Sequence, residues 1–152
     1  MTRPPLDEYF LGLLPQVASR GTCRRRQVAA IITNVKGHIL ATGYNGVPSN
    51  IQHCIDVPCP GVDDPKGDSS RCEALHAEAS ALLQCLDLAA AHTMYCSCTP
   101  CFNCAKMICN TPIKRIITLE LYPDPLGLNL FERAHIYVEY GHGTGRVFRS
   151  QQ

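Results

Sequence analysis

The spacing of apolar residues along the chain predicts helices that alternate with short strands. Apolar side chains recur at helical spacing in two segments, and short runs rich in β-branched residues indicate strands. Pro100 indicates a third helix, because proline is favoured at the first helical position. We expect helices over residues 6–19, 73–88 and 100–109 and a helical turn over residues 128–134. We expect strands over residues 28–33, 38–44, 92–97, 114–119 and 135–140.

The order of these elements predicts an α/β fold. The turn residues 34–37 lie between the first two strands, which indicates a hairpin. The later strands alternate with helices, which favours parallel pairing under covering helices. We therefore expect three layers, α/β/α, around a mixed sheet of about five strands. The helix over residues 73–88 is expected to bury one face, formed by Leu75, Ala79, Leu82, Leu83 and Leu86.

A chain of 152 residues suits one domain, so we expect a single domain over residues 1–152. Residues 44–72 form a long stretch rich in proline, glycine and aspartate. A loop of this length is uncommon in a compact domain unless something organises it. Because it contains Cys54, Cys59 and Cys72, we expect a metal to do so. Residues 141–152 are expected to form a tail.

Composition excludes several classes of protein. A hydrophobic fraction of 45% and a net charge of +1 argue against disorder and against a basic surface that wraps nucleic acid. No apolar stretch reaches the roughly 18–20 residues of a membrane span, and the first residues do not resemble a signal peptide. We therefore expect a cytoplasmic protein without a membrane partner. In that compartment the ten cysteines indicate metal ligands or core residues more than disulfides.

Two short motifs carry the candidate chemistry. The first is His76-Ala77-Glu78, and the second is a proline followed by Cys101-x-x-Cys104. Each motif alone is weak evidence, but together they supply one histidine and two cysteines. Three such ligands leave the fourth tetrahedral position of zinc open, as catalytic zinc sites do. The start of a helix also favours the thiolate form of a cysteine there.

Glu78 is the expected catalytic residue of this site. A zinc ion can lower the pKa of a bound water molecule to about 7. A carboxylate beside that water can take its proton and later protonate a leaving group. We therefore expect Glu78 to act as both general base and general acid, with His76, Cys101 and Cys104 as zinc ligands.

These motifs resemble the His-x-Glu and Pro-Cys-x-x-Cys signature of the cytidine deaminase superfamily. The resemblance is strongest to the deoxycytidylate deaminases and extends from about residue 5 to residue 140. It is carried by residues 23–28, 42–46, 71–78, 101–108 and 112–117. It implies a cytidine-deaminase-like fold and zinc-dependent hydrolysis of dCMP to dUMP and ammonia, which supplies thymidylate synthesis.

The resemblance also implies further site residues and partners. Asn45, Ala77 and Tyr122 would contact the substrate. Residues Gly43, Tyr44, Asn45 and Gly46 resemble the segment that binds regulatory nucleotides, where dCTP with magnesium activates and dTTP inhibits. The family usually assembles as a homohexamer. Independently, the ability of arginine to bind phosphate makes Arg26 a candidate for the substrate phosphate, although a solvated arginine is an equal alternative.

A second zinc site is expected outside the catalytic motif. The family often carries a structural zinc in this region, and four cysteines form the closed set that structural sites prefer. The expected ligands are Cys23, Cys54, Cys59 and Cys72, with His53 as a competitor of Cys59.

Two other functions remain open at this point. The chain could deaminate another cytosine nucleotide, such as dCTP or a 5-modified dCMP, or a nucleoside. Alternatively, it could be a non-catalytic zinc-binding module. Glu78 argues against the second alternative, because a structural zinc site has no need of a carboxylate beside the open position.

Overall fold

The computed structural model describes residues 2–122 and 124–141 of the chain. The predicted tail therefore lies outside the described residues from position 142 onward, and the prediction of one domain over residues 1–152 stays a prediction. The elements follow one another as α1 (Leu6–Ala18), β1 (Ala29–Thr33), β2 (Ile39–Tyr44), α2 (Ala77–Gln84), a 3-10 turn (Leu88–Ala90), β3 (Thr93–Cys98), α3 (Phe102–Cys109), β4 (Arg115–Glu120), α4 (Pro125–Arg133) and β5 (Tyr137–Tyr140). None of the helices in this described part has the length and apolar character needed to cross a membrane.

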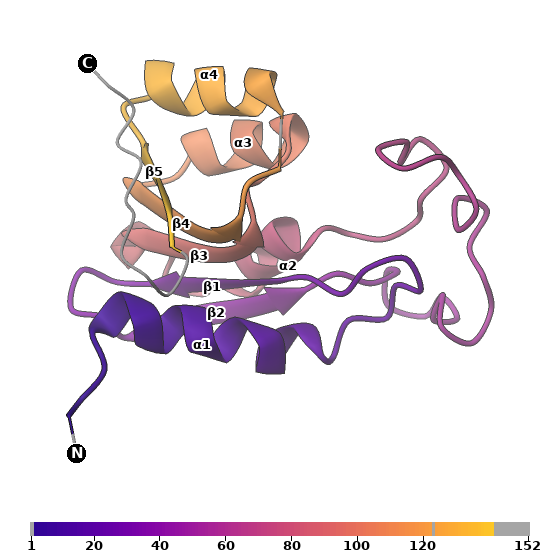
Figure 1. Ribbon diagram of the computed structural model, residues 1–152, viewed down its shortest axis with the longest axis horizontal. Coiled ribbons are helices and arrows are strands. Elements are labelled where there is room, and N and C mark those ends of the chain that lie inside the picture. The colour runs from indigo at the N-terminus through magenta and orange to yellow at the C-terminus, as the bar shows by residue number, and fades with distance from the viewer. Residues whose placement is uncertain (1, 123, 142–152) are drawn as a thin grey trace.

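The strands form a mixed five-stranded sheet in the order β2-β1-β3-β4-β5, which confirms the predicted fold class. Strand β1 is antiparallel to both of its neighbours, and β3, β4 and β5 are parallel to one another. Figure 1 shows α1 beside the first two strands and the pair α3 and α4 toward the β4 and β5 end.

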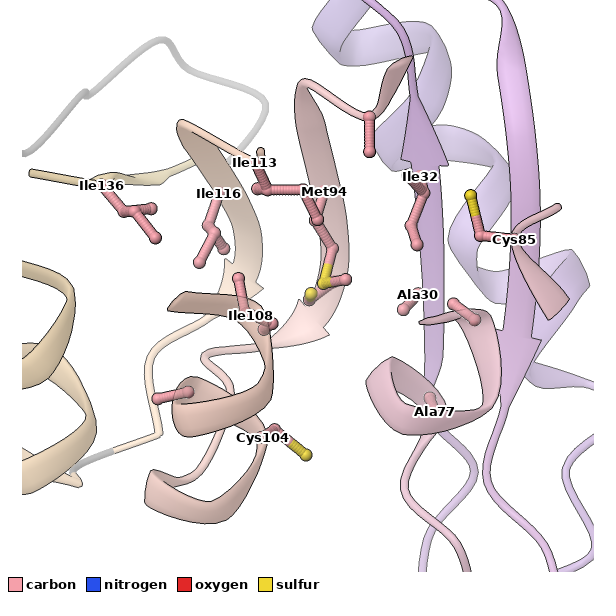
Figure 2. Close-up of a cluster of buried hydrophobic side chains, with 14 of the residues drawn as sticks. Ala30, Ile32, Ala77, Cys85, Met94, Cys104, Ile108, Ile113, Ile116 and Ile136 are labelled. Carbon is pink, nitrogen blue, oxygen red and sulfur yellow. The ribbon is translucent and has the colours of Figure 1, made fainter. Parts of the chain in front are cut away.

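Both faces of the sheet are covered, because successive side chains of its central strands alternate between two buried clusters. In β1, Ala30 and Ile32 join the cluster under α2 and α3, whereas Ile31 joins the cluster under α1. Figure 2 shows the larger cluster, in which Met94 of β3 and Ile108 of α3 meet between sheet and helices. The predicted three layers thus arise from continuous apolar strands with a helix on each side.

A network of charged and polar side chains connects α1 with β3, β4 and β5. The Arg115 guanidinium of β4 donates hydrogen bonds to the Asp7 carboxylate at 2.7 and 2.9 Å, and to the Glu139 carboxylate at 2.5 and 3.0 Å. The Tyr95 hydroxyl donates to the same Asp7 at 2.8 Å. One side chain of α1 therefore joins β3 and β4.

The helix predicted over residues 73–88 is wrong in its length and in its buried face. Helix α2 begins at Ala77, because Leu75 instead pairs with Gly46 in an isolated β-bridge. It ends at Gln84, because the next residue has an extended backbone. Leu83 and Leu86 are exposed. The buried face consists of small residues and one acid, namely Ala77, Glu78, Ala79 and Ala81.

Gly43 explains why small residues line α2. A Cβ atom at Gly43 of β2 would lie 2.3 Å from the Ala77 carbonyl oxygen and 2.4 Å from the Ala81 nitrogen. Real Cβ atoms do not approach other atoms so closely, so the two backbones touch directly. This contact fixes the start of α2 against the sheet.

The predicted helical turn over residues 128–134 is also too short. Helix α4 begins three residues earlier, at Pro125, because the Asp124 side chain caps it by accepting hydrogen bonds from the Leu126 and Gly127 amides. Aspartate at the cap followed by proline at the first position is a strong start signal for a helix.

The β2–α2 loop (residues 45–76) projects from one end of the sheet (Figure 1). Its two ends meet, because Gly46 and Leu75 exchange backbone hydrogen bonds of 3.2 and 2.8 Å. Between them the chain is irregular. Arg71 forms an ion pair with Asp64 within the loop, and the Ile55 amide donates to the Thr22 carbonyl at 3.1 Å.

Candidate active site

The sheet topology gathers the candidate residues at one edge. Since β1 is antiparallel to both β2 and β3, those two strands run in the same direction, and β4 is parallel to β3. Their carboxyl ends therefore meet at one edge, where ligands bind in open α/β sheets. Asn45 follows β2, Cys98 ends β3 and Tyr122 follows β4, and all three line one cleft of about 540 Å³.

The three candidate metal ligands converge at this cleft: His76 and Cys101 line it, and Cys104 is buried beside them. His76 immediately precedes α2, Cys101 immediately precedes α3, and Cys104 lies in the first turn of α3. The His76 Nδ1 atom lies 3.4 Å from the Cys101 sulfur and 3.5 Å from the Cys104 sulfur. All three ligand atoms lie within 4.8 Å of one another.

These separations fit a zinc ion. Tetrahedral bonds of about 2.3 Å to sulfur and about 2.05 Å to nitrogen place the two ligand atoms about 3.6 Å apart. The observed sulfur–nitrogen distances of 3.4 and 3.5 Å are close to this value. The three side chains could therefore hold zinc with little movement, and three protein ligands would leave a fourth position for water or substrate.

Hydrogen bonds within the cluster prepare one thiolate. The pKa of Cys101 is lowered to about 4, because the Cys104 thiol donates a hydrogen bond to its sulfur and His76 does so as well, against the opposing effect of burial. The same donation, together with burial, raises the pKa of Cys104. The hydrogen bond with Cys101 raises the pKa of His76. Zinc binding would therefore release protons, most directly from Cys104.

Glu78 lies beside the ligands. Its side chain is buried, and its Oε2 atom lies 3.7 Å from the Cys104 sulfur. Burial raises the pKa of the Glu78 carboxyl, an effect that a hydrogen bond with its own backbone amide and the nearby His76 only partly offset. A carboxyl group with a raised pKa can both accept and return a proton near neutral pH.

Asn45 and Ala77 also lie at the expected place. Both line the cleft. The Asn45 side chain already has two backbone partners, because its oxygen accepts from the Val28 amide at 2.9 Å and its nitrogen donates to the Arg26 carbonyl at 2.8 Å. Asn45 therefore holds the backbone of the residues that lead into β1. The second N–H group of its side chain can donate to a ligand.

The two arginines at the cleft have different surroundings. Arg26 lines the cleft and forms an exposed ion pair of 2.6 Å with Glu120. Arg25 also lines the cleft, and its guanidinium donates to the carbonyl oxygens of Gly61, Pro65 and Asp68 at 3.1, 3.2 and 2.8 Å. Sequence reasoning missed this role of Arg25, since nothing in the run of three arginines distinguishes it.

Asp124 is another cleft residue that sequence reasoning missed. Besides capping α4, its carboxylate accepts a hydrogen bond of 2.7 Å from the Phe102 amide, between the two candidate zinc cysteines. The Asp-Pro pair was a signal for the start of a helix. Nothing in the sequence connects that start with the cysteine motif.

The predicted effector segment is only partly at the cleft. Of Gly43, Tyr44, Asn45 and Gly46, only Asn45 is among the described lining residues. Gly43 allows α2 to touch β2, as described above. A Cβ atom at Gly46 would lie 2.5 Å from the Thr22 hydroxyl oxygen. Packing accounts for both glycines.

The four cysteines of the predicted structural site lie near one another. The Cys59 amide approaches the Cys54 sulfur at 3.5 Å. Burial raises the pKa of Cys72, a hydrogen bond from the Ala74 amide lowers it, and the nearby sulfur atoms of Cys59 and Cys23 raise it further. Within the described residues, however, these side chains do not form a group of three with ligand atoms inside 4.8 Å. The competitor His53 is exposed beside Asp56. The second zinc site stays a prediction.

Comparisons with known proteins agree with this geometry. A family model described as the cytidine and deoxycytidylate deaminase zinc-binding region matches residues 4–120, which contain the whole cluster. The deoxycytidylate deaminase of Mycobacterium phage D29 is 39% identical over 125 residues, covering 77% of this chain and 96% of that protein. The deoxycytidylate deaminase of Saccharomyces cerevisiae is 36% identical over 127 residues, covering 80% of this chain and 40% of that protein.

A solved structure extends the likeness to three dimensions. The dCMP deaminase of cyanophage S-TIM5, in complex with dCMP and dUMP, matches with a TM-score of 0.72 and 25% sequence identity. The match covers 93% of this chain and 100% of that chain.

Proposed function

The chain belongs to the cytidine and deoxycytidylate deaminase family, and we propose that it hydrolyses dCMP to dUMP and ammonia in a zinc-dependent reaction. The observation that carries the proposal is the convergence of His76, Cys101 and Cys104 beside the buried carboxyl of Glu78. This arrangement lies in a cleft large enough for a nucleotide. The relatives named deoxycytidylate deaminase support dCMP as the substrate.

In the proposed mechanism the chain itself moves the protons. His76, Cys101 and Cys104 would hold zinc, which when bound supplies the Lewis acidity that makes water nucleophilic near neutral pH. Glu78 takes a proton from the attacking water and passes it to the ring nitrogen of the cytosine. It then takes the second proton, from the hydroxyl group now on the ring carbon, and passes it to the amino group that leaves as ammonia. The carbon–nitrogen bond breaks and a carbonyl group replaces it, so water is the only co-reactant.

The other cleft residues would bind the nucleotide. Asn45 offers its remaining N–H group, while Ala77 and Tyr122 form the wall beside it. We keep Arg26 as the candidate for the phosphate, because its ion-pair partner Glu120 is exposed and the pair is open to solvent. Arg25 is less suited, since its guanidinium already donates to three carbonyl groups of the loop.

Ammonia release from dCMP, dCTP, deoxycytidine and cytidine tests the proposal. We expect turnover of dCMP, and we expect Glu78→Gln to lower kcat by about 10²–10⁴-fold, the usual contribution of general acid–base catalysis. The zinc content should not change, because Glu78 is not among the ligands. Glu73→Gln, which changes an exposed carboxylate nearby, is the matched control and should behave like the parent.

Each contrary result has a distinct meaning. Full activity of Glu78→Gln would reject the assigned mechanism. Turnover of dCTP or a nucleoside without turnover of dCMP would keep the mechanism and change the substrate. A zinc-loaded protein that turns over none of these compounds would be a non-catalytic zinc module.

We further propose a structural zinc held by Cys23, Cys54, Cys59 and Cys72. The support is that the first three thiols are buried, that Cys59 lies near both Cys54 and Cys72, and that Cys23 lies near Cys72. Three of the four belong to a loop with little core of its own, which a metal would stabilise. Elemental analysis should find two zinc ions per chain in the parent and one in Cys54→Ser. Cys109→Ser, which removes a thiol outside both sets, should retain two. A single zinc in the parent would contradict the proposal.

Regulation and assembly complete the proposal. We propose activation by dCTP with magnesium, inhibition by dTTP, a homohexamer and a cytoplasmic location, all supported by the family likeness. The ten free thiols also suit a reducing compartment. Adding dCTP with magnesium, and separately dTTP, to the dCMP assay would test the two regulatory effects, and measuring the mass of the assembly in solution would test the homohexamer. An unchanged rate or a monomeric mass would remove the corresponding part.

A further inference from the structure

The first turn of α4 is joined to the turn that presents the zinc cysteines. The Asp124 side chain makes the connection with both of its oxygens. Oδ1 accepts hydrogen bonds from the Leu126 and Gly127 amides at 3.1 and 3.3 Å, while Oδ2 accepts from the Phe102 amide at 2.7 Å. One carboxylate therefore caps α4 and binds the first amide of α3.

The two segments also touch through their backbones. Gly127 is buried, and a Cβ atom there would lie 3.2 Å from the Pro100 carbonyl oxygen and 3.4 Å from the Phe102 nitrogen. Glycine at this position lets α4 lie directly against residues 100–102. This contact is independent of the Asp124 hydrogen bond and indicates the same junction.

The Phe102 amide belongs to the peptide bond that follows Cys101. Holding that amide fixes the orientation of the peptide and, through it, the direction in which the Cys101 side chain leaves the backbone. At the other side of the turn, the Cys104 backbone amide donates to the Cys101 sulfur. The two ends of the motif are thus fixed by different partners, one outside the motif and one inside it.

We propose that Asp124 is a positioning residue, which holds Cys101 in its zinc-binding orientation through the Phe102 amide and so makes zinc affinity depend on α4. Asp124 touches no zinc ligand atom itself. Groups that orient metal ligands in this way typically contribute 10–100-fold to metal affinity or activity. The inference rests on the proposed zinc-dependent function.

Two substitutions separate the hydrogen bond between Asp124 and the Phe102 amide from the cap that Asp124 provides for α4. In Asp124→Ser, the shorter hydroxyl can still cap α4 but cannot also reach the Phe102 amide. In Asp124→Asn, only one side-chain oxygen remains. That oxygen can accept from the first amides of α4 or from the Phe102 amide, but not from both. Glu132→Gln removes an exposed carboxylate from the same helix and is the matched control.

The measurements are zinc affinity, by competition with a chromophoric chelator, and hydrogen exchange at the Phe102 amide in the zinc-free protein. We expect Asp124→Ser to bind zinc about 10–100-fold more weakly than the parent and to exchange this amide faster. Glu132→Gln should match the parent in both. The helical circular dichroism of Asp124→Ser should equal that of the parent, which would exclude general loss of α4.

Parental zinc affinity in Asp124→Ser would overturn the inference. If Asp124→Ser does not fold, Asp124→Asn decides: parental zinc affinity together with faster exchange of the Phe102 amide in that variant overturns the inference equally. A parent that binds zinc and deaminates dCMP while both variants match it leaves the proposed function intact and rejects only the role of Asp124. A parent that binds no zinc rejects both.

Discussion

Glu78 occupies a position that would be unfavourable in a protein selected for stability alone. Its carboxyl is buried, and the Cys104 thiol donates to it over a long distance of 3.7 Å. Burial of a carboxylate disfavours its charged form. The same burial gives Glu78 the raised pKa that proton transfer requires. Function and stability therefore oppose each other at this residue.

This opposition predicts the pH dependence of stability in the zinc-free protein. Glu78 in the unfolded chain ionises above its ordinary pKa of 4.5, whereas in the folded protein it keeps its proton to higher pH. The folded state then binds more protons, so the free energy of unfolding falls as pH rises from 4.5 towards the folded-state pKa. Urea unfolding should show Glu78→Gln and parent alike near pH 4 and the variant more stable at pH 7.

The control for this experiment is Glu73→Gln, whose profile should follow that of the parent. If the difference in free energy of unfolding between Glu78→Gln and the parent does not change with pH, the carboxyl of Glu78 keeps an ordinary pKa. The proposed proton transfer then loses its support.

At the level of single residues, the sequence identified side chains that act together in short motifs. His76, Glu78 and the two cysteines have a spacing that indicates zinc chemistry by itself. Arg25 and Asp124 were missed, because each acts on backbone groups of a distant segment. Backbone acceptors and donors are the same for every residue type, so no sequence pattern reveals these partners.

At the level of elements, α2 depends on a glycine in the neighbouring strand. The direct contact between β2 and α2 at Gly43 places Ala77 against the sheet, with His76 and Glu78 on either side of it. A larger side chain at Gly43 must push α2 outward. Both groups that matter for zinc chemistry would then move together.

A pair of alanine substitutions tests this dependence. Gly43→Ala should lower the free energy of unfolding by about 3 kcal/mol or more, at or above the upper end of the usual cost of overpacking, because its Cβ would meet backbone atoms at 2.3 and 2.4 Å. Gly12→Ala in α1 meets nothing within 4 Å and should stabilise by about 0.5–1 kcal/mol. Chemical denaturation measures both, and equal stabilities of the two variants would contradict the packing account.

Element boundaries were less predictable than element types. All five strands lie where β-branched runs indicated, whereas the helix predicted from residue 73 begins at Ala77. The leucines that suggested a longer helix are exposed at Leu83 and Leu86. Tertiary contacts explain these differences. The β-bridge between Gly46 and Leu75 prevents the first predicted turn of α2 from forming, and the close contact at Gly43 leaves room only for small side chains on the buried face of α2.

At the level of the whole molecule, Asp7, Arg115 and Glu139 connect the beginning of the described chain with its last strand. Burial raises the pKa of Asp7, but hydrogen bonds from Arg115 and Tyr95 outweigh this effect and leave it lowered. Sequence reasoning did not find this ion-pair network for two reasons. Asp7 and Arg115 are 108 positions apart, and Arg115 and Glu139 lie on strands whose pairing the pattern only suggested.

We expect Asp7→Asn to destabilise the protein by about 1–2 kcal/mol at pH 7, a value discounted for the partial exposure of the pair. A lowered aspartate pKa stabilises the fold above its ordinary value of 3.8, and this contribution is lost as pH falls through the folded-state pKa. The stability difference between variant and parent should therefore shrink in acid. Glu8→Gln, an exposed neighbour on α1, should show no such difference in urea unfolding at either pH.

The hydrogen bonds between Gly46 and Leu75 close the β2–α2 loop at its base and so separate it from the strands and helices of the domain. Residues 47–74 leave and return at the same point, so this segment can lengthen, shorten or be replaced without shifting β2 or α2. Gly67, Asp68 and Ser69 of the segment nevertheless form part of the cleft wall. Evolution could therefore vary the wall that meets the nucleotide separately from His76 and Glu78, provided that the contacts of the segment with Thr22 and Arg25 are kept.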